Sequence, residues 1–588
     1  MGELRTILPY FRPYRAALLV GIVCTALANV LQIAAPYLTK LAIDGLSEAD
    51  ATPGGIAMLG GLSVLAAAIG GVFRYAMRQL MNGISRRVET DLRDAYFRHL
   101  LHLDATYYGA VRTGDLMSRA TNDTSAVRQA VGPSVMYLVN TAVTFVFALA
   151  FMLWISPRLT ALAMLGMAVL PFIVLGFGRV IHQRYEQIQE QFSAMSTFVQ
   201  ENFTGVRIVR AYTQERDQAR RFDAFNQDYR ARNMELARTA GLFHPLLGLL
   251  SGTAMVIATW MGGTEVMSGA MTLGDFVAFS LYLATMVWPM IALGWVVNGI
   301  KRGEASMGRI NEVMRVEPRV AAPASPTALP SVRGEIAFRD VSFTYPGTER
   351  AVLEGITFSA RAGETVAIVG PTGSGKSTLV SLMARLYDPS GGEISLDGTP
   401  LTALDPGKLR HHIGVVPQDP FLFSDTIEAN LALGIEGTGD DPGRGEIVRR
   451  AASIAQLHEQ ILGFPSQYAT QLGERGINLS GGQKQRATLA RALARAPEVI
   501  VLDDALSAVD THTEAAILAD LRGALRGTTA FIISHRVSAV MHADQILVLE
   551  HGRIVERGKH ADLIASHGTY ARLLRRQLLE EGLESAVA

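Results

Sequence analysis

The sequence contains a glycine-rich run whose residue types could hold a chain of phosphates. It reads Gly370, Pro371, Thr372, Gly373, Ser374, Gly375, Lys376, Ser377 and Thr378. Glycines let backbone N–H groups close around phosphate oxygens, and a helix that begins at such a loop adds a favourable dipole. Lys376 is then expected to reach the β- and γ-phosphates, and the Ser377 hydroxyl to ligate Mg²⁺. Because the apolar stretch 366–369 precedes the run and predicts a strand, the run indicates a nucleoside triphosphate site.

Two further segments suit the same chemistry. The apolar stretch 499–502 ends in Asp503 and Asp504 and predicts a buried strand with carboxylates at its end, where Mg²⁺ can bind. Between the two features lies a short serine–glycine segment, made of Leu479, Ser480, Gly481, Gly482 and Gln483. Placed at a helix N-terminus, such a segment is a second backbone cradle for an anion.

Composition restricts the class of protein. A chain of 588 residues has room for two or three domains. Its formal net charge of zero gives no overall basic field for binding nucleic acid. A hydrophobic fraction of 49% predicts contact with lipid. The single cysteine, Cys24, excludes an intrachain disulfide framework and a cysteine-based metal cluster.

Six apolar stretches are long enough to cross a bilayer of about 30 Å. They lie near residues 16–38, 55–76, 132–155, 158–178, 241–263 and 273–297. The second and fourth connections between them are rich in arginine, whereas the three others are short and almost free of it. By the positive-inside rule, both termini and both long connections are cytoplasmic. The long connections also have helical periodicity, so we expect the membrane helices to continue into the cytoplasm and turn back there.

These patterns predict a fold of two domains. We expect an α-helical six-span membrane domain with long cytoplasmic helical extensions at 1–315 and a linker rich in Pro, Ala and Ser at 316–333. Short β-branched strands alternating with helices then predict an α/β P-loop domain at 334–576, before a tail at 577–588.

At this point the sequence resembles a known family. Residues 334–576 resemble the nucleotide-binding domain of ATP-binding cassette (ABC) proteins, because the 479–483 segment matches that family's signature and lies about twenty residues before the strand end at Asp503. The six spans resemble the membrane domain of the family's exporters. The resemblance therefore covers essentially the whole chain and implies a half-transporter that uses ATP and Mg²⁺.

The resemblance implies roles for individual residues. Tyr345 matches the aromatic residue that stacks on adenine, and Gln418 matches the glutamine that contacts Mg²⁺ and senses the γ-phosphate. Asp503 matches the metal-binding carboxylate, completing with Ser377 and Gln418 an implied magnesium site. Catalytic roles are implied for Asp504, for His535, which matches the histidine at the γ-phosphate, and for Gln418.

Other implied roles concern assembly and coupling. In the family two nucleotide domains meet head to tail, so that Leu479, Ser480, Gly481, Gly482 and Gln483 are expected to cover ATP held by a partner. Ser507 and Asp510 match a loop that links the two nucleotide sites. Coupling to the membrane domain is implied for Gly114 and Asp115 in the first long connection, Ala211 and Tyr212 in the second, and Glu474 before the signature.

The chain departs from the family pattern at Asp504, where a glutamate is usual. Aspartate keeps the charge but is one methylene shorter, and a misplacement of about 1 Å can cost about a hundredfold in rate. One interpretation is that this chain hydrolyses ATP poorly at its own site and pairs with a different subunit that carries the glutamate. The other is a conservative exchange compensated by a shift of the backbone.

These observations favour ATP-driven export of amphipathic or hydrophobic compounds by a dimer, expected to be heterodimeric, in the plasma (inner) membrane of a bacterium. The partners are then a second half-transporter, membrane lipid and a small amphipathic or lipid-like substrate, with no nucleic acid. The spans contain few acidic or basic residues, which speaks against a strongly charged substrate. Three alternatives stay open: a homodimeric lipid flippase, an ATP-gated channel or regulator, and an importer of a membrane-soluble chelate.

Overall fold

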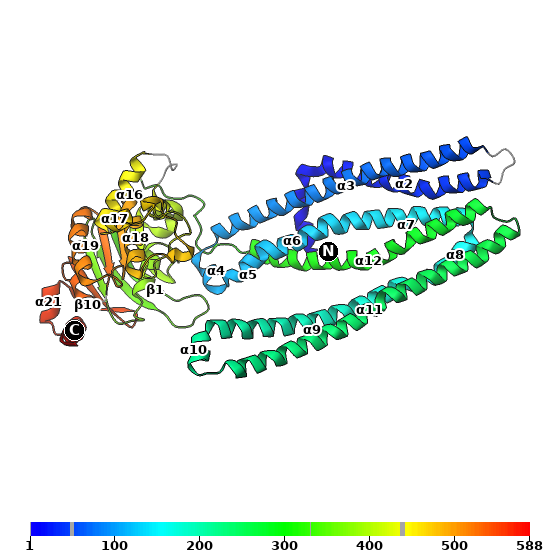
Figure 1. Cartoon of the computed structure of the whole chain (residues 1–588). Coiled ribbons are helices and arrows are strands. Elements are labelled where there is room, and N and C mark those ends of the chain that lie inside the picture. Colours follow the sequence, from blue (N-terminus) through cyan, green and yellow to red (C-terminus); the bar gives the residue numbers. More distant parts are fainter. Residues whose placement is uncertain (1, 47–51, 330, 436–441, 535, 588) are drawn as a thin grey trace. The chain divides into compact units, whose positions relative to one another are not determined.

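The computed structural model describes residues 2–46, 52–329, 331–435, 442–534 and 536–587. The chain divides into two compact units (Figure 1). A helical unit comprises Met1–Leu101 and Thr113–Val316, and a unit with two sheets comprises His102–Arg112 and Glu317–Ala588. A short segment from within the helical half of the sequence, His102–Arg112, therefore belongs to the unit with the sheets.

The helical unit is built from long helices because its sequence combines apolar runs with helix-forming residues. Its helices are α1 (Leu8–Phe11), α2 (Arg15–Leu46), α3 (Pro53–His102), α5 (Thr113–Ser118), α6 (Thr124–Gln129), α7 (Val135–Ile155), α8 (Pro157–Met167), α9 (Leu170–Thr204), α10 (Val206–Ala211), α11 (Glu215–Met267) and α12 (Leu273–Met314). The π-helical turns η3 (Arg119–Asp123) and η4 (Ala130–Ser134) connect α5, α6 and α7 into one continuous rod.

Within the described residues, five helical segments are long and apolar enough to cross a membrane. They begin at Glu3, Pro53, Thr113, Glu215 and Leu273, and they contain five of the six predicted spans. Several extend far beyond an apolar stretch: α3 has 50 residues and α11 has 53, against the roughly 20 that a bilayer needs. The predicted helical extensions are therefore confirmed.

The fourth predicted span, 158–178, falls on two helices rather than one. Helix α8 ends at Met167 and α9 begins at Leu170. Pro171 lies in the first turn of α9, where its missing backbone N–H costs no helical hydrogen bond. Because Pro171 has no backbone N–H, it cannot donate a hydrogen bond to a carbonyl group of α8. The helix is therefore interrupted between α8 and α9.

Glycines allow α12 to approach the α6–η4 rod very closely. A Cβ added at Gly303 would lie 2.2 Å from the Cβ of Ala130, and one at Gly299 would lie 2.4 Å from the Ser134 hydroxyl oxygen. Separations below 3 Å cannot be tolerated, so the spacing of these two helices depends on the absence of side chains at both positions. Buried residues of α7, α8, α11 and α12 form one apolar core of the helical unit.

The other unit contains two sheets. One has the strand order β2-β1-β4-β5 and the other β10-β9-β3-β8-β7-β6. The strands are β1 (Ile336–Phe343), β2 (Leu353–Ala360), β3 (Thr365–Val369), β4 (Gly391–Leu396), β5 (Thr399–Pro400), β6 (Ile413–Val416), β7 (Val499–Asp503), β8 (Thr529–Ile533), β9 (Gln545–Glu550) and β10 (Arg553–Gly558). From β9 to β6 every pair is parallel, which explains the continuous apolar runs of β3, β7 and β9.

The same unit contains helices before, between and after these strands, and the predicted α/β fold is confirmed. They are α4 (Ala105–Ala110), α13 (Lys376–Met383), α14 (Pro406–His411), α15 (Ile427–Leu431), α16 (Pro442–Ile454), α17 (His458–Leu462), α18 (Gly481–Ala494), α19 (Thr511–Ala524), α20 (Val537–Val540), α21 (His560–Ala565) and α22 (Thr569–Val587). The described residues of this unit form several apolar cores, one of which contains Leu379 of α13 and another Leu489 of α18. Alternate residues of β7 belong to these two cores, Val501 to the first and Leu502 to the second, so the phosphate-loop helix and the helix after the signature pack on opposite faces of the six-stranded sheet.

Candidate functional site

The parallel strands align the sequence features at one sheet edge. In the strand register Val416 pairs with Leu502, and Ile533 pairs with both Asp503 and Ile368. The carboxyl ends of β3, β8, β7 and β6 are therefore level. The glycine-rich loop, Asp503, Asp504 and Gln418 all follow these ends, so the fold brings them together at the edge where ligands bind in open α/β sheets. His535 follows β8 but lies outside the described residues.

Two glycines of the loop are required by its geometry. Gly370 has a φ of +154°, and a Cβ there would lie 2.1 Å from the carbonyl oxygen of Leu549. Gly375 has a φ of +103°, and its Cβ would lie 2.7 Å from a methyl group of Leu353. At Gly373 no atom lies within 4 Å of an added Cβ. The loop is therefore packed tightly on the protein side and open at its tip.

Polar groups of the loop match a phosphate ligand. The Ser374 hydroxyl is buried without a hydrogen-bond partner among the described residues. The Lys376 ammonium donates to the carbonyl oxygens of Gly370 and Pro371, at 2.8 Å each. Burial lowers the pKa of Lys376, while the charges of Asp503 and Asp504 act in the opposite direction. An unsatisfied buried hydroxyl and a desolvated cation at one loop both gain from a bound anion.

The residues predicted to contact adenine and Mg²⁺ lie beside the phosphate loop or at the ends of β6 and β7. The Tyr345 hydroxyl lies 3.1 Å from the Thr378 hydroxyl, which holds its half-buried ring beside the phosphate-loop helix. Gln418 and Ser377 are exposed, and Asp503 is buried at the end of β7. A carboxylate, an amide oxygen and a hydroxyl are hard ligands that suit Mg²⁺, which usually keeps several waters and substrate phosphates around it. The residues present therefore fit both ATP and Mg²⁺.

Asp504 has an unusual backbone. Its φ is +48°, in the left-handed region, and its backbone N–H donates to the Ile533 carbonyl at 2.9 Å. Aspartate and asparagine enter this region more readily than other residues with a side chain. The turn after β7 thus supplies a local reason for a short polar residue at this position.

The signature segment starts a helix. Ser480 caps α18: its hydroxyl accepts from the Gln483 N–H at 3.3 Å, and the Gln483 side chain accepts from the Ser480 N–H at 2.9 Å. Leu479 is buried, whereas Ser480 and Gly481 are exposed. In the described part of the chain, no hydrogen bond or ion pair joins this segment to the glycine-rich loop. The exposed start of α18 is left available to another molecule.

Sequence reasoning missed two residues that hold the predicted inter-site loop. Gln485, on α18, is 3% exposed; its amide donates to the Ser507 hydroxyl and its oxygen accepts from the Ala508 N–H, both at 2.8 Å. The Arg536 guanidinium donates to the carbonyl oxygens of Ser507 and Val509. Asp510 ends the loop as the cap of α19. The sequence did offer a signal for Gln485. It lies three residues before Thr488 and four before Leu489, on the apolar face of the helix, where a polar side chain needs a partner.

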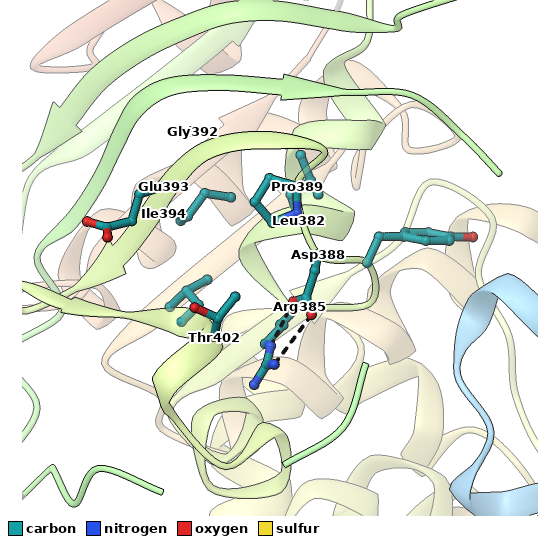
Figure 2. Close-up of a pocket in the computed structure, with 10 residues that line it drawn as sticks. Leu382, Arg385, Asp388, Pro389, Gly392, Glu393, Ile394 and Thr402 are labelled. Atoms are coloured by element: carbon teal, nitrogen blue, oxygen red, sulfur yellow. Dashed lines mark hydrogen bonds and ion pairs between the residues drawn. The ribbon is translucent and has the colours of Figure 1, made fainter. Parts of the chain in front are cut away.

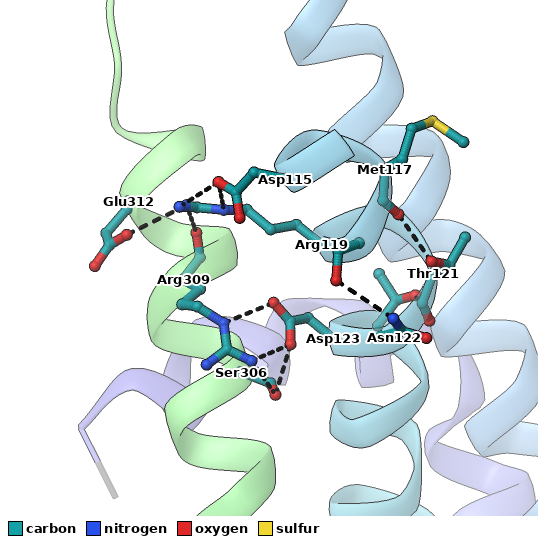
Figure 3. Close-up of polar contacts among 11 residues, drawn as sticks. Asp115, Met117, Arg119, Thr121, Asn122, Asp123, Ser306, Arg309 and Glu312 are labelled. Carbon is teal, nitrogen blue, oxygen red and sulfur yellow. Dashed lines mark hydrogen bonds and ion pairs between the residues drawn. The ribbon is translucent and has the colours of Figure 1, made fainter. Parts of the chain in front are cut away.

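The five predicted coupling residues are divided between the two units. Asp115 pairs with Arg119 at 2.9 Å, and Arg119 also pairs with Glu312 of α12 at 3.2 Å. Figure 3 shows these pairs beside a second one between Asp123 and Arg309. Of the others, Gly114 lies in α5, Ala211 ends α10, Tyr212 is 74% exposed after it, and Glu474 is exposed in the sheet-containing unit. The structure thus ties Asp115 to α12 and leaves Tyr212 and Glu474 at the surface.

Comparison with known proteins adds family evidence to this geometry. Residues 18–290 match the ABC transporter transmembrane region, and residues 353–507 match the ABC transporter domain. The chain is 39% identical over 580 residues to a "Probable multidrug resistance ABC transporter ATP-binding/permease protein" of Bacillus subtilis, covering 97% of this chain and 98% of the relative. It is 38% identical to a "Multidrug resistance-like ATP-binding protein" of Escherichia coli, covering 98% and 97%.

A third relative and a solved structure extend the comparison. An "ATP-dependent lipid A-core flippase" of Pseudomonas fluorescens is 35% identical, with 99% of this chain and 97% of the relative covered. The solved structure is that of a bacterial Atm1-family ABC exporter with ATP bound. It has a TM-score of 0.79 and 27% identity, and it covers 96% of this chain and 98% of its own.

Proposed function

The chain belongs to the ABC transporter family, and we propose that it is one half of a dimeric exporter that uses ATP to move amphipathic or hydrophobic compounds across a membrane. The observation that carries the proposal is the level alignment of β3, β8, β7 and β6, which places the phosphate loop, Asp503, Asp504 and Gln418 at one edge. The same chain contains five helical segments, within its described residues, that are long enough to span a bilayer.

Each residue of the edge has a proposed task. Backbone N–H groups of the loop and the Lys376 ammonium bind the phosphates, and the Tyr345 ring stacks on adenine. Ser377, Gln418 and Asp503 would hold Mg²⁺, which neutralises charge on the phosphates when bound. Asp504 positions the attacking water, a task of orientation more than of covalent chemistry.

The signature acts on the nucleotide of a partner subunit in this proposal. Its support is that Ser480 and Gly481 are exposed at the start of α18, which packs on the opposite face of the six-stranded sheet from α13. A helix N-terminus attracts an anion through its free N–H groups and dipole. ATP then joins two subunits, and its hydrolysis releases them.

Asp504 leads us to propose an asymmetric pair. Its carboxylate is one methylene short of the usual glutamate, so this chain would hydrolyse ATP slowly at its own site while its intact signature completes the site of a partner that carries glutamate. The left-handed turn at Asp504 offers the competing account, in which aspartate is kept for its backbone preference.

We further propose a bacterial inner membrane as the location, with both termini in the cytoplasm. The support is the distribution of arginine over the connections between apolar stretches. The substrate class follows from the scarcity of charge in those stretches and from the names of the relatives, which include multidrug resistance proteins and a lipid A-core flippase.

The test compares Asp504→Glu with the parent chain in sealed proteoliposomes, alone and together with a half-transporter that carries the glutamate. ATP hydrolysis and ATP-dependent accumulation of a fluorescent amphipathic dye are both measured. We expect no uphill dye movement from Lys376→Ala, and about a tenfold or greater gain in hydrolysis at this chain's site from Asp504→Glu. Asp562→Glu, an exposed aspartate of α21, is the matched control.

Each result has a defined meaning. Unchanged hydrolysis by Asp504→Glu in both assemblies contradicts the impaired-site proposal. Full activity of the parent chain alone, with labelled lipid moving between leaflets, supports the homodimeric flippase instead. ATP-dependent dye movement that only dissipates a gradient indicates a gated channel, and accumulation in the opposite direction indicates an importer.

A further inference from the structure

The Asp104 carboxylate joins two parts of the chain that are far apart in sequence. Asp104 precedes α4, and one of its oxygens caps that helix by accepting from the Thr106 N–H at 2.9 Å. Its other oxygen accepts from the backbone N–H groups of Arg319 and Val320, the latter at 3.1 Å. One side chain therefore fixes both the turn that follows α3 and the chain that leaves α12.

The segment that leaves α12 is itself attached to the sheet-containing unit. Its composition predicted a linker, and it contains no helix or strand among its described residues. Even so, the Val320 side chain is only 9% exposed, and Thr327 donates to the Ala403 carbonyl at 2.9 Å. At its end, the Asp397 carboxylate accepts from the N–H groups of Arg333 and Glu335. The linker is thus a strap laid along the nucleotide domain.

Arg385 is the anchor for the start of this strap. It is 3% exposed, and its guanidinium donates to the carbonyl oxygens of Ala321 and Leu404, at 3.2 and 2.7 Å. It also pairs with Asp388 at 2.8 Å, as Figure 2 shows beside a cavity of about 110 Å³. A buried guanidinium with this many fixed partners holds the strap in one place.

The same region reaches the adenine side of the nucleotide site. The Tyr387 ring lies edge-on to the Tyr345 ring, with 5.4 Å between centroids, and packs against Phe343 at 5.6 Å. Burial raises the pKa of Tyr387, and the neighbouring groups Tyr345 and Asp104 raise it further, so Tyr387 lies within electrostatic reach of Asp104. Contacts therefore run from Thr378 through Tyr345 to Tyr387, which senses the charge of Asp104.

We propose that Asp104 is a positioning residue that fastens α4 to the docked linker, so that α4 and the linker that follows α12 move as one piece during transport. This inference rests on the proposed ATP-driven transport. Its physical basis is that one carboxylate with three backbone donors resists separation of the segments it joins, since hydrogen bonds to a charged group are among the stronger ones. Removing the second oxygen leaves α4 capped but free of the strap.

Two substitutions separate fastening from capping. Asp104→Ser keeps a capping hydroxyl for α4 but cannot reach Arg319 and Val320 as well, whereas Asp104→Ala removes both functions. Asp94→Asn, at a position of α3 that is 67% exposed, is the matched control. The variants are made in the full chain and assembled as for the parent protein, in lipid nanodiscs and proteoliposomes.

The first measurement is amide hydrogen exchange of the peptide 317–322, which needs no transport. We expect exchange to be about tenfold faster in both Asp104 variants and unchanged in Asp94→Asn. The second is the number of dye molecules moved per ATP hydrolysed. We expect this ratio to fall about tenfold in Asp104→Ser and Asp104→Ala while ATP hydrolysis stays within about twofold of the parent.

Two outcomes overturn the inference. Parent-like exchange in Asp104→Ser shows that Asp104 does not hold the strap, and a parent-like coupling ratio in that variant shows that capping of α4 is sufficient. A parent protein that moves no dye contradicts the proposed function instead, and the exchange measurement still decides whether Asp104 holds the linker.

Discussion

The Gln485 side chain lies 2.8 Å from both the Ser507 hydroxyl and the Ala508 N–H, and so joins the helix after the signature to the loop after Asp504. In the proposed dimer the signature serves one nucleotide and Asp504 the other. A Cβ on Gly482 would lie 2.7 Å from the Ala508 carbonyl oxygen, so α18 and this loop are also in close contact. In that dimer, this short connection would link the two nucleotide sites.

We expect Gln485→Ala to slow ATP hydrolysis about tenfold or more with little change in ATP affinity, because it loosens the loop that carries Asp504. The substitution leaves the Ala508 N–H without its partner, at a cost of about 1–3 kcal/mol. Gln485→Glu retains an acceptor for Ala508 and should lose less. Steady-state hydrolysis and nucleotide titration measure both effects, with Gln227→Ala on the exposed surface of α11 as the control. Equal activity of Gln485→Ala and the parent would contradict the proposed connection.

We expect Ser374→Ala to separate stability from nucleotide binding. The Ser374 hydroxyl is buried without a partner in the described residues, so its removal should leave the apparent thermal midpoint unchanged or slightly higher without nucleotide. ATP affinity should fall about tenfold, since the hydroxyl is then missing from the phosphate cradle. Ser381→Ala, whose hydroxyl donates to the Ser377 carbonyl on the same helix, is the control. Unaltered ATP affinity would mean that Ser374 does not face the phosphates.

We expect Gly303→Ala to destabilise the helical unit by about 1–3 kcal/mol, because its Cβ would overlap that of Ala130. Gly252→Ala on α11 meets open space and should stabilise by up to about 1 kcal/mol through helix propensity alone. Thermal unfolding in one detergent compares the two. The double variant Ala130→Gly with Gly303→Ala should recover much of the loss, and a failure to do so would argue against this contact as the cause.

The Asp104 contact should persist from about pH 5 to 8. Burial alone raises the pKa of Asp104, but the N–H groups of Val320, Arg319 and Thr106 outweigh it and hold that pKa below its ordinary value. A carboxyl with a lowered folded pKa is fully ionised above its unfolded value of about 3.9, and its contribution is lost only as pH falls through the lower folded value. Amide exchange of 317–322, corrected for intrinsic rates, should show constant protection in this range. A loss of protection near pH 6 would contradict it.

Much of the nucleotide site was predictable from the sequence because its features are local. The glycines at 370 and 375, the helix after them and the strand before Asp503 follow from backbone freedom and apolar periodicity within a few residues. The spans were predictable for a similar reason, since a bilayer demands a long apolar stretch. The exception was the stretch 158–178. Its apolar pattern is continuous, but the helix is interrupted before Pro171.

Other relationships depended on the tertiary structure. No spacing indicates that Asp104 accepts from residues 319 and 320, that Gln485 holds the loop at Ser507, or that Gly303 meets Ala130, because each contact joins segments that only folding brings together. From its composition, the segment 316–333 was predicted only to be a linker. In the structure, hydrogen bonds from its backbone to Asp104, Arg385 and Asp397 attach it to the nucleotide domain. The sequence by itself thus determined which chemistry the chain carries and which stretches can span a membrane. The tertiary structure decided which distant segments are held together within each unit, since such contacts depend on side chains that meet only after folding.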